Sequence, residues 1–432
     1  MAGRHIVMAT VGSQGDLFPF LAVGRELAAR GHRVTIAAHS LHRQAVAEAG
    51  LDFLLASGIA EPDDKAAFAA RAFHPWRGPR FVVRDMAAVD VAASHAALAP
   101  VCADADAIVT TTLAFAGQII GETGRLAWLS GVLSPAVFLS AWDPPATGWG
   151  AFDAAVRRSP GRGIWLRRMA AWITASWTQP VRDFRMSLGL PVVSPWGDPF
   201  HEGQHARDGV LAMYSPVLGT LPPDAPSQAT ITGQCRYAPA GDVLPDTLAA
   251  FLDDGEPPIV FTLGSAAVHA GADFLRESIA AATSLGRRAV LLTGSPDMRA
   301  RLPDPLPDGI AIEEYAPHGA LFARAAVVVH HGGVGTTQEA LRSGRPQLVV
   351  PHGFDQPDNA ARVERLGVGR VLRASRYEAA RAAMLLNVLL TDADIAARAA
   401  HLATGIRSER GAVVAADAIE AAIAKRSMQK AP

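Results

Sequence analysis

The chain has 432 residues, half of them hydrophobic, and 40 basic residues balance 41 acidic ones to a formal net charge of −1. This length is sufficient for two domains, each with its own hydrophobic core. The balanced charge excludes the global positive field that recruits nucleic acid. Cys102 and Cys235 are too few for a disulfide framework or a zinc site, which fits a reducing compartment.

No stretch reaches the roughly 18 uninterrupted apolar residues that a membrane-spanning helix needs. The apolar run near the N-terminus is short and a glycine turn follows it, so it is interpreted as a first strand and not as a signal peptide. The sequence therefore predicts a cytoplasmic protein.

The first half of the chain alternates apolar strands with helical segments. A strand over residues 6–11 leads through a glycine turn into a helix over residues 17–29, and a second strand follows at 34–37. A further strand is expected at 106–112, before a helix at 115–123. This alternation predicts a parallel sheet covered by helices on both faces.

Prolines accumulate between residues 216 and 258 and mark a domain junction. We expect an N-terminal domain over residues 1–228 and a linker region over 229–257. A C-terminal domain follows over 258–432, with its last helix as a candidate to pack back on the first domain. The second half repeats the strand-helix pattern, with strands expected at residues 259–263, 288–293, 310–315, 326–330 and 346–350.

A glycine turn follows the strand at 326–330. It reads His330-His331-Gly-Gly-Val-Gly, and a helical segment runs from Thr336 to Ser343. Glycine lets the backbone turn tightly and come close to a ligand, while a helix N-terminus offers free N–H groups and a positive dipole end. The segment predicts an anion site suited to a diphosphate.

Asp355 and Gln356 come where the next strand ends. Ligands of open parallel sheets lie beyond the carboxyl ends of the strands. An acid and an amide in that position suit a polyhydroxylated group, because each can bond two hydroxyls.

The segment from residue 315 to 356 resembles the nucleotide-sugar signature of family 1 glycosyltransferases, which include plant, sterol and bacterial antibiotic glycosyltransferases. Residues 11–20, Val-Gly-Ser-Gln-Gly-Asp-Leu-Phe-Pro-Phe, resemble the opening motif of the sterol and antibiotic branches. The whole chain is similar to bacterial rhamnosyltransferases that build rhamnolipids. This resemblance implies an α/β chain with the GT-B fold, in which two Rossmann-like domains face each other across a cleft.

The resemblance also implies an inverting enzyme whose donor is a nucleotide sugar, either UDP-glucose or dTDP-rhamnose. His331 and the turn after it would hold the diphosphate from one side. Gly264 and Ser265, which follow an earlier strand, would form the opposite wall. Glu339 would bond the ribose hydroxyls, Tyr315 would stack on the base beside His318, and Asp355 with Gln356 would hold the sugar. The residues implied for the diphosphate are Gly264, Ser265, His331, Gly332, Gly333, Gly335 and Thr336. His330 and His352 are expected to be structural.

Asp16 follows the turn formed by Gly12, Ser13 and Gly15 and begins the next helix. One role open to it is N-capping. The functional interpretation is a general base that takes the acceptor proton as the oxygen attacks the anomeric carbon. In many relatives a histidine stands here with an aspartate on a later strand, but the matching strand end in this chain reads Thr-Thr-Thr at 110–112. That departure favours Asp16 acting alone.

Two Asp-x-Asp sequences, at 104–106 and 392–394, resemble the motif of metal-dependent glycosyltransferases, but neither follows a strand as that metal site requires. A helix dipole and a histidine replace the cation in the GT-B scheme. We therefore expect no metal and no other cofactor.

All eight tryptophans lie in the first half, and Trp142 and Trp149 are candidates to line an acceptor site. Residues 162–177 mix arginines with large aromatics in a helical composition. This indicates an interfacial helix, an apolar acceptor cleft or ordinary helix packing. We expect a hydrophobic acceptor with a hydroxyl group, for example a lipid, and peripheral contact of the protein with the inner membrane. The sequence is compatible with a monomer and with a homodimer.

Two other classes remain as alternatives. A nucleotide-sugar 2-epimerase shares the architecture, and a non-catalytic nucleotide-sugar-binding protein would keep the C-terminal site. An NAD-dependent oxidoreductase is excluded, because residues 12–16 do not supply Gly-x-Gly-x-x-Gly.

Overall fold

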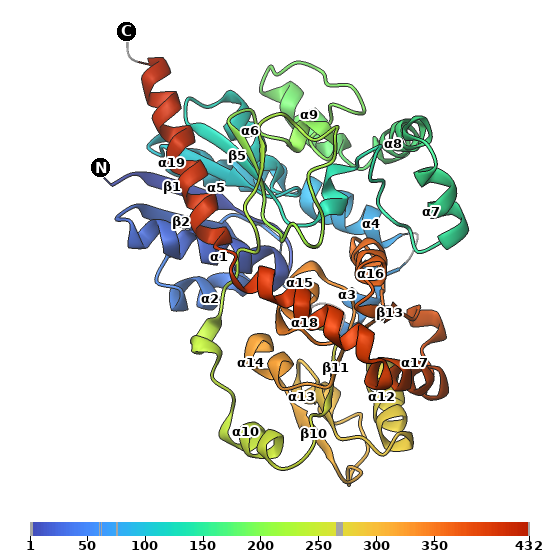
Figure 1. Ribbon diagram of the computed structural model, residues 1–432. Coiled ribbons are helices and arrows are strands. Elements are labelled where there is room, and N and C mark those ends of the chain that lie inside the picture. The colour runs from blue at the N-terminus through green and yellow to red at the C-terminus, as the bar shows by residue number, and fades with distance from the viewer. Residues whose placement is uncertain (1–2, 60, 62, 75–76, 265–270, 431–432) are drawn as a thin grey trace. The chain divides into compact units, whose positions relative to one another are not determined.

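The computed structural model describes residues 3–59, 61, 63–74, 77–264 and 271–430 (Figure 1). The chain forms two compact units, each built on a parallel β-sheet with helices packed against it. The first unit comprises Met1–Asp63, Trp76–Tyr237 and Arg410–Pro432, and the second comprises Asp64–Pro75 and Ala238–Glu409.

The sheet of the first unit has seven strands in the order β3-β2-β1-β4-β5-β6-β7, and every neighbouring pair is parallel. The central strands are buried along most of their length because helices cover both faces, as expected for continuous apolar runs. The strands are β1 (His5–Ala9), β2 (Arg33–Ala38), β3 (Asp52–Leu55), β4 (Ala107–Thr110), β5 (Ala127–Val132), β6 (Gly209–Ala212) and β7 (Ala229–Ile231).

The helices of the first unit include the C-terminal helix α19, red in Figure 1, which packs against α1 and beside β5 and β6. The α-helices are α1 (Gln14–Ala29), α2 (Arg43–Glu48), α4 (Gly78–Arg80), α5 (Val91–Ala103), α6 (Phe115–Thr123), α7 (Gly150–Arg157), α8 (Pro160–Thr174), α9 (Gln179–Ser187) and α19 (Gly411–Lys430). Shorter helical segments are η1 (Ser40–His42), η2 (Phe81–Ala88), η3 (Pro135–Phe138) and η4 (Glu202–Gln204).

The sheet of the second unit has six strands in the order β10-β9-β8-β11-β12-β13, again with every neighbouring pair parallel. The strands are β8 (Ile259–Thr262), β9 (Ala289–Leu292), β10 (Ile310–Glu313), β11 (Val327–His330), β12 (Gln347–Val349) and β13 (Gly369–Val371). The helical elements are α3 (Lys65–Ala72), η5 (Pro239–Asp242), α10 (Asp246–Asp253), α12 (Ala272–Ser284), α13 (Pro296–Arg299), α14 (His318–Ala323), α15 (Val334–Ser343), α16 (Gln356–Arg365), η7 (Ala374–Arg376), α17 (Ala379–Thr391) and α18 (Ala393–Arg407).

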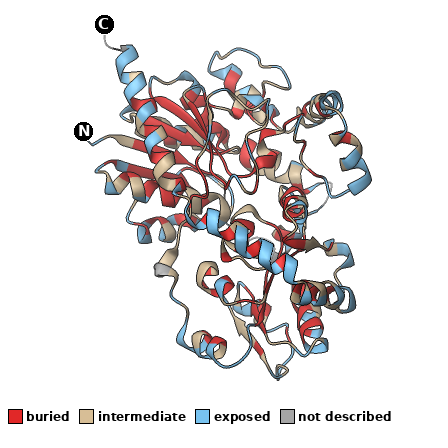
Figure 2. Cartoon of the chain, in the orientation of Figure 1, coloured by how far each residue is buried: buried red, intermediate tan, exposed pale blue. Residues whose placement is uncertain are grey.

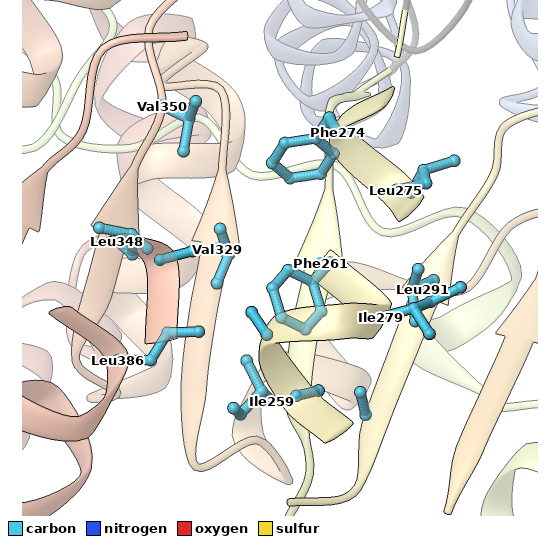
Figure 3. Close-up of a cluster of buried hydrophobic side chains, with 14 of the residues drawn as sticks. Ile259, Phe261, Phe274, Leu275, Ile279, Leu291, Val329, Leu348, Val350 and Leu386 are labelled. Carbon is cyan, nitrogen blue, oxygen red and sulfur yellow. The ribbon is translucent and has the colours of Figure 1, made fainter. Parts of the chain in front are cut away.

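One face of this second sheet packs against α12 and α17. Figure 3 shows Phe261 of β8 beside Phe274 of α12, and their ring centroids lie 6.4 Å apart in an edge arrangement. Val329 and Leu348 extend the same cluster across β11 and β12, where Leu386 of α17 covers them. The opposite face packs against α10, α14 and α15. This rigid core fixes the strand ends from which the loops of the site emerge.

Figure 2 shows buried residues along the strands and exposed residues along the outer faces of the helices. Among the described residues, no single helix is long and apolar enough to cross a membrane. One pair, Gly78–Ala88 with Val91–Ala103, reaches that length and composition together, but it bends by 48° at the break.

The structure divides the chain differently from the boundaries that proline content suggested. Strand β7 lies inside the expected linker region at 229–257 and completes the first sheet, while Asp64–Pro75 packs with the second unit. Helix α19 packs with the first unit, which confirms the expectation for the last helix. The sequence-based prediction did not include strands β3, β5, β6, β7 and β13.

Candidate functional site

Both predicted glycine turns lie where the strand order of a sheet reverses. In the first sheet, β1 lies between β2 and β4, so successive strands are added in one direction up to β3 and in the other direction from β4 onward. Residues 12–16 follow β1 at this point of reversal. In the second sheet the same reversal falls between β8 and β11, which end next to Gly264 and His331. Such switch points form crevices at the carboxyl ends of the strands, where open α/β sheets bind ligands.

Asp16 lies in the first turn of α1 as part of a capping box. Its Oδ2 accepts hydrogen bonds from the Ser13 backbone N at 2.7 Å and from Ser13 Oγ at 3.2 Å, while Gly15 N donates to Ser13 Oγ at 3.2 Å. A Cβ on Gly12, where φ is +143°, would lie 2.2 Å from Asp16 Oδ2. The turn therefore requires glycine so that the carboxylate can lie against the backbone.

Burial raises the pKa of the half-buried Asp16 carboxyl to about 6, because desolvation disfavours the charged form, and the hydrogen bonds from Ser13 oppose the rise. Both Ser13 bonds reach Oδ2, so Oδ1 is the oxygen that an acceptor hydroxyl would approach. A carboxylate with a pKa near 6 is a better proton acceptor than an ordinary aspartate and is still mostly ionised at pH 7.

The strand end next to β1 carries threonines that contact the residues before the turn of Asp16. Ala9 of β1 aligns with Thr110 of β4, and the Val11 backbone N donates to Thr111 Oγ1 at 3.4 Å. His42 Nε2 hydrogen-bonds the carbonyl oxygen of Gly12 at 3.0 Å, so its ring supports the turn itself. The loop that carries Asp16 is therefore held by a threonine and a histidine.

His331 lies in a slot formed by glycine backbone. A Cβ on Gly264, where φ is +67°, would lie 2.5 Å from His331 Cε1, and a Cβ on Gly333 would lie 2.4 Å from its Nε2. Burial, together with His330, His352 and His318 nearby, holds the pKa of His331 well below its usual value. The imidazole is therefore neutral at pH 7, and its buried Nδ1 has no hydrogen-bond partner among the described residues.

His330 is a satisfied core histidine. Its Nε2 bonds Gln347 Oε1 at 2.9 Å, and the Gly332 backbone N donates to its Nδ1 at 3.1 Å. Burial lowers its pKa to about 4, which keeps the ring neutral. The structure thus places His330 in support of the turn and leaves His331 at the strand end.

The N-terminus of α15 is open to a ligand. Its N-cap residue is Gly333, whose carbonyl oxygen accepts the first helical hydrogen bond, from Thr337 N at 2.9 Å, so the N–H groups of the first turn have no partner within the helix. A Cβ placed on Gly335 would meet no atom of the described residues within 4 Å. Thr336 is buried in the first turn, and Glu339 lies one turn further along. This end of the helix can bind an anion through its free N–H groups and dipole.

The residues assigned to the nucleobase follow β10. Tyr315 is half exposed, with 50% of its surface accessible, and His318 begins α14. The His318 ring stacks on Phe322 with centroids 4.6 Å apart, and burial lowers its pKa to about 4. Ser265, which was expected to lie opposite the turn, falls outside the described residues.

The residues assigned to the sugar lie at the start of α16 and already have partners. Gln356 is buried, and its Oε1 accepts from the backbone N atoms of His352 at 2.8 Å and Gly353 at 3.2 Å. Asn359 Nδ2 donates to Asp355 Oδ2 at 2.8 Å and to the carbonyl oxygen of Gly332 at 2.9 Å. Asn359 thus joins the loop after β12 to the glycine turn after β11.

Sequence reasoning missed Asn359 and a second contact to the same loop. Phe73, at the end of α3, packs edge-on to Phe354 with centroids 5.5 Å apart, and Phe354 has a positive φ of +58°. The position of Asn359 one helical turn after Asp355 was a usable signal. No local pattern could reveal Phe73, because that contact spans most of the chain.

The two Asp-x-Asp sequences have structural roles. Asp106 accepts hydrogen bonds from Arg4 Nη1 and from the His5 backbone N, both at 2.9 Å, and Asp392 Oδ1 caps α18 through the backbone N atoms of Asp394 and Ile395. Within the described part of the chain, no three His, Cys, Asp or Glu side chains gather in a metal-binding group.

Trp142 and Trp149, which the sequence analysis proposed for the acceptor site, are both exposed in the segment before α7.

Comparisons with known proteins cover both halves of the chain. The model described as glycosyltransferase family 28 N-terminal domain matches residues 6–136, and that of the erythromycin biosynthesis protein CIII-like C-terminal domain matches residues 290–420. O-mycaminosyltylonolide 6-deoxyallosyltransferase of Streptomyces fradiae is 32% identical over 422 residues, which cover 94% of each chain.

Solved structures show the same fold. The glycosyltransferase of kitacinnamycin has a TM-score of 0.69 and 24% identity, with 98% of this chain and 99% of that chain covered. Glycosyltransferase VinC in complex with dTDP has a TM-score of 0.65 and 20% identity, with 98% and 100% covered. Two parallel sheets of this kind, each with a site at its switch point, define the GT-B class of glycosyltransferases.

The chain belongs to family 1 of these enzymes, in the group that includes the antibiotic and other natural-product glycosyltransferases. The fold class and the enzyme class expected from the sequence are therefore confirmed.

Proposed function

We propose that the protein transfers a sugar from a nucleoside diphosphate sugar to a hydroxyl group of a hydrophobic acceptor, with inversion at the anomeric carbon and without a metal ion. The observation that carries this proposal is the N-terminus of α15, where three features come together: first-turn N–H groups without a partner inside the helix, space beside Gly335 that no described residue fills, and the neutral imidazole of His331. A diphosphate is the ligand that such a glycine turn suits best.

The donor that we would test first is a dTDP-linked 6-deoxyhexose. The Streptomyces relative is named as a 6-deoxyallosyltransferase, and the VinC structure contains dTDP. UDP-glucose remains the second candidate, because the His330-His331 pair favours the branch that uses it. In both cases Glu339 bonds the ribose and Tyr315 stacks on the base.

The proposed reaction is a single displacement. The acceptor oxygen forms its bond to the anomeric carbon while the bond from that carbon to the diphosphate oxygen breaks, and the acceptor proton passes to Asp16 Oδ1. The departing diphosphate gains negative charge, which the α15 N–H groups and an imidazole N–H of His331 stabilise. Since His331 is neutral, it contributes a hydrogen bond and not a positive charge. One displacement inverts the configuration.

Calorimetry and transfer assays on Asp16→Asn test this proposal against its alternatives. Wild-type protein should bind dTDP or UDP in the presence of EDTA, which a metal-dependent site would not allow. Asp16→Asn should keep that binding while transfer falls by about 100- to 10,000-fold, the usual contribution of a general base. Asp52→Asn is the matched control, since Asp52 makes an exposed ion pair with Arg33 in the same unit.

The possible results separate the classes. If Asp16→Asn transfers at the wild-type rate, the base assignment is wrong. If the wild-type protein interconverts nucleotide sugars without any acceptor, it is a nucleotide-sugar 2-epimerase. Nucleotide binding without transfer to any hydroxylated acceptor would identify a non-catalytic binding protein.

A further inference from the structure

Helix α8 of the first unit presents an outer face unlike the rest of the surface. Trp165 and Trp172 expose 62% and 71% of their surface, and Met169 and Ile173 are exposed with them. Arg162 and Arg168 lie on the same side, because these six positions follow the three- and four-residue spacing of one helix face. We call these residues the Trp/Arg face. Figure 2 shows the exposed residues along α7 and α8.

The opposite side of α8 already makes the contacts that hold the helix. Gly163 packs so closely that a Cβ there would lie 2.3 Å from the carbonyl oxygen of Ala141, and Ala171 is buried. Arg167 bonds Asp224 at 2.9 Å and lies over the Trp196 ring at 4.6 Å. The Trp/Arg face is therefore not needed for folding of this unit.

The charge around this face is positive and largely uncompensated. From Gly150 to Thr174 the chain carries five arginines and a single acid, Asp153, which is engaged by Thr147 and the Gly148 backbone N. Arg158, Arg162 and Arg168 are exposed and make no ion pair within the described part of the chain. Because the whole protein has a net charge of −1, this positive charge is a local feature.

We propose that the Trp/Arg face binds the surface of a bilayer that contains anionic phospholipid. Indole rings favour the boundary between headgroups and acyl chains, since the ring is apolar and its N–H needs a polar partner. Met169 and Ile173 add apolar surface at the same depth, and the guanidinium groups of Arg162 and Arg168 face the lipid phosphates. Arg162 already donates one hydrogen bond, from Nη1 to the carbonyl oxygen of Ala155 at 2.8 Å, but it has no ion-pair partner among the described residues. The helix lies along the bilayer surface and does not cross it. Exposed Phe152 of the adjoining helix α7 extends the apolar surface.

Vesicle co-sedimentation with the full chain tests the proposal, with vesicles of phosphatidylcholine alone and of phosphatidylcholine mixed with phosphatidylglycerol. Binding should be roughly tenfold or more tighter to the anionic vesicles, because each basic residue near such a surface adds to the attraction. It should weaken when salt rises from about 0.1 M to about 1 M, where the screening length falls from about 10 Å to about 3 Å.

Two pairs of substitutions separate the contributions. The double variant Arg162→Glu, Arg168→Glu should lose the preference for anionic lipid. Its control is the double variant Arg301→Glu, Arg381→Glu, which changes the net charge equally but on exposed residues of the second unit. This control should bind vesicles as the wild-type protein does. Trp165→Ser with Trp172→Ser should reduce binding roughly tenfold or more, and Met384→Ser, at a position 62% exposed in α17, serves as its control. Retained nucleotide binding and circular dichroism show that each variant is folded.

Insertion depth gives an independent measurement. Acyl-brominated lipid should quench tryptophan fluorescence in the wild-type protein and lose that effect in the Trp165→Ser, Trp172→Ser variant. Equal binding to neutral and anionic vesicles, or no binding to either, overturns the proposal. The proposal would also be overturned if the wild-type protein bound no vesicles and the Trp165→Ser, Trp172→Ser variant had a different oligomeric state. The Trp/Arg face would then be an interface between copies of the protein. None of these assays uses a sugar donor, so their outcome is independent of the proposed transfer.

Discussion

At the scale of single residues, Asp16 has a structural role in the capping box of α1, beside the chemical role that we propose for it. The capping box explains why an acid stands at the third position of α1, and the same geometry holds the carboxylate against Gly12 and Ser13. Burial of that carboxylate raises its pKa to about 6. The N-cap residue is Ser13 and not Asp16, but Asp16 completes the capping box from the third helical position, and this contact orients the group that we propose as the base.

The pH dependence of transfer follows from the raised pKa of Asp16. A base must be ionised, so kcat/KM should be constant above pH 7 and fall about tenfold per pH unit below a pKa of about 6. Ser13→Ala removes the hydroxyl bond to the ionised carboxylate, so the acidic limb should move to higher pH. Loss of the cap should also cost about 1 kcal/mol of stability. An acidic limb near the ordinary aspartate value of about 4 would contradict the assignment.

At the scale of single elements, the glycines around His331 have different requirements. The His331 ring occupies the volume of any Cβ on Gly264, which follows β8, or on Gly333, which precedes α15. Gly335, in the first turn of α15, has no such neighbour among the described residues. Packing therefore explains the first two glycines, while the third is free for a ligand that approaches the backbone.

Alanine substitutions in this turn distinguish the two roles. Gly333→Ala should displace His331 and lower the melting temperature together with nucleotide affinity. Gly335→Ala should keep the melting temperature, because alanine favours helix and meets no atom, yet weaken dTDP or UDP binding by filling the space beside the diphosphate. Differential scanning fluorimetry and calorimetry measure both quantities. Wild-type affinity in Gly335→Ala would mean that the diphosphate does not approach this part of the helix.

At the scale of the whole molecule, the first unit is completed by the end of the chain. Helix α19 buries Ile419 and Ile423 with three alanines, and Glu420 bonds His32 Nε2 at 2.8 Å and Arg30 Nη1 at 2.6 Å. The hydrogen bond with His32, followed by those with Arg30, lowers the pKa of Glu420. These contacts join α19 to the end of α1 and the start of β2.

Deletion of residues 410–432 should therefore destabilise the N-terminal unit. Burial of the α19 side chains contributes on the order of 5 kcal/mol, comparable with the total stability of a domain. Hydrogen exchange should rise in α1, β5 and β6, while the strands of the second sheet stay protected. A chain that ends at Arg426 keeps every buried side chain of α19 and is the control. Unchanged exchange in the first sheet would show that α19 is dispensable.

The sequence by itself determined the fold class and the position of two glycine turns at strand ends. Alternation of apolar strands with helices requires covered parallel sheets, and both glycine turns were visible because backbone conformation restricts residue type locally. The assignments to phosphate, ribose and sugar came from resemblance and stay predictions. Only the nucleotide-binding experiments can test them.

The tertiary structure decided what depends on distant contacts. Short strands such as β7 and β13 carry too few residues for a periodic signal, and their pairing partners, not their composition, make them strands. The raised pKa of Asp16, the neutral state of His331, the contact of Phe73 with Phe354 and the place of α19 all arise from burial among residues far apart in sequence. Burial is a property of the packed chain, so no local pattern contains it.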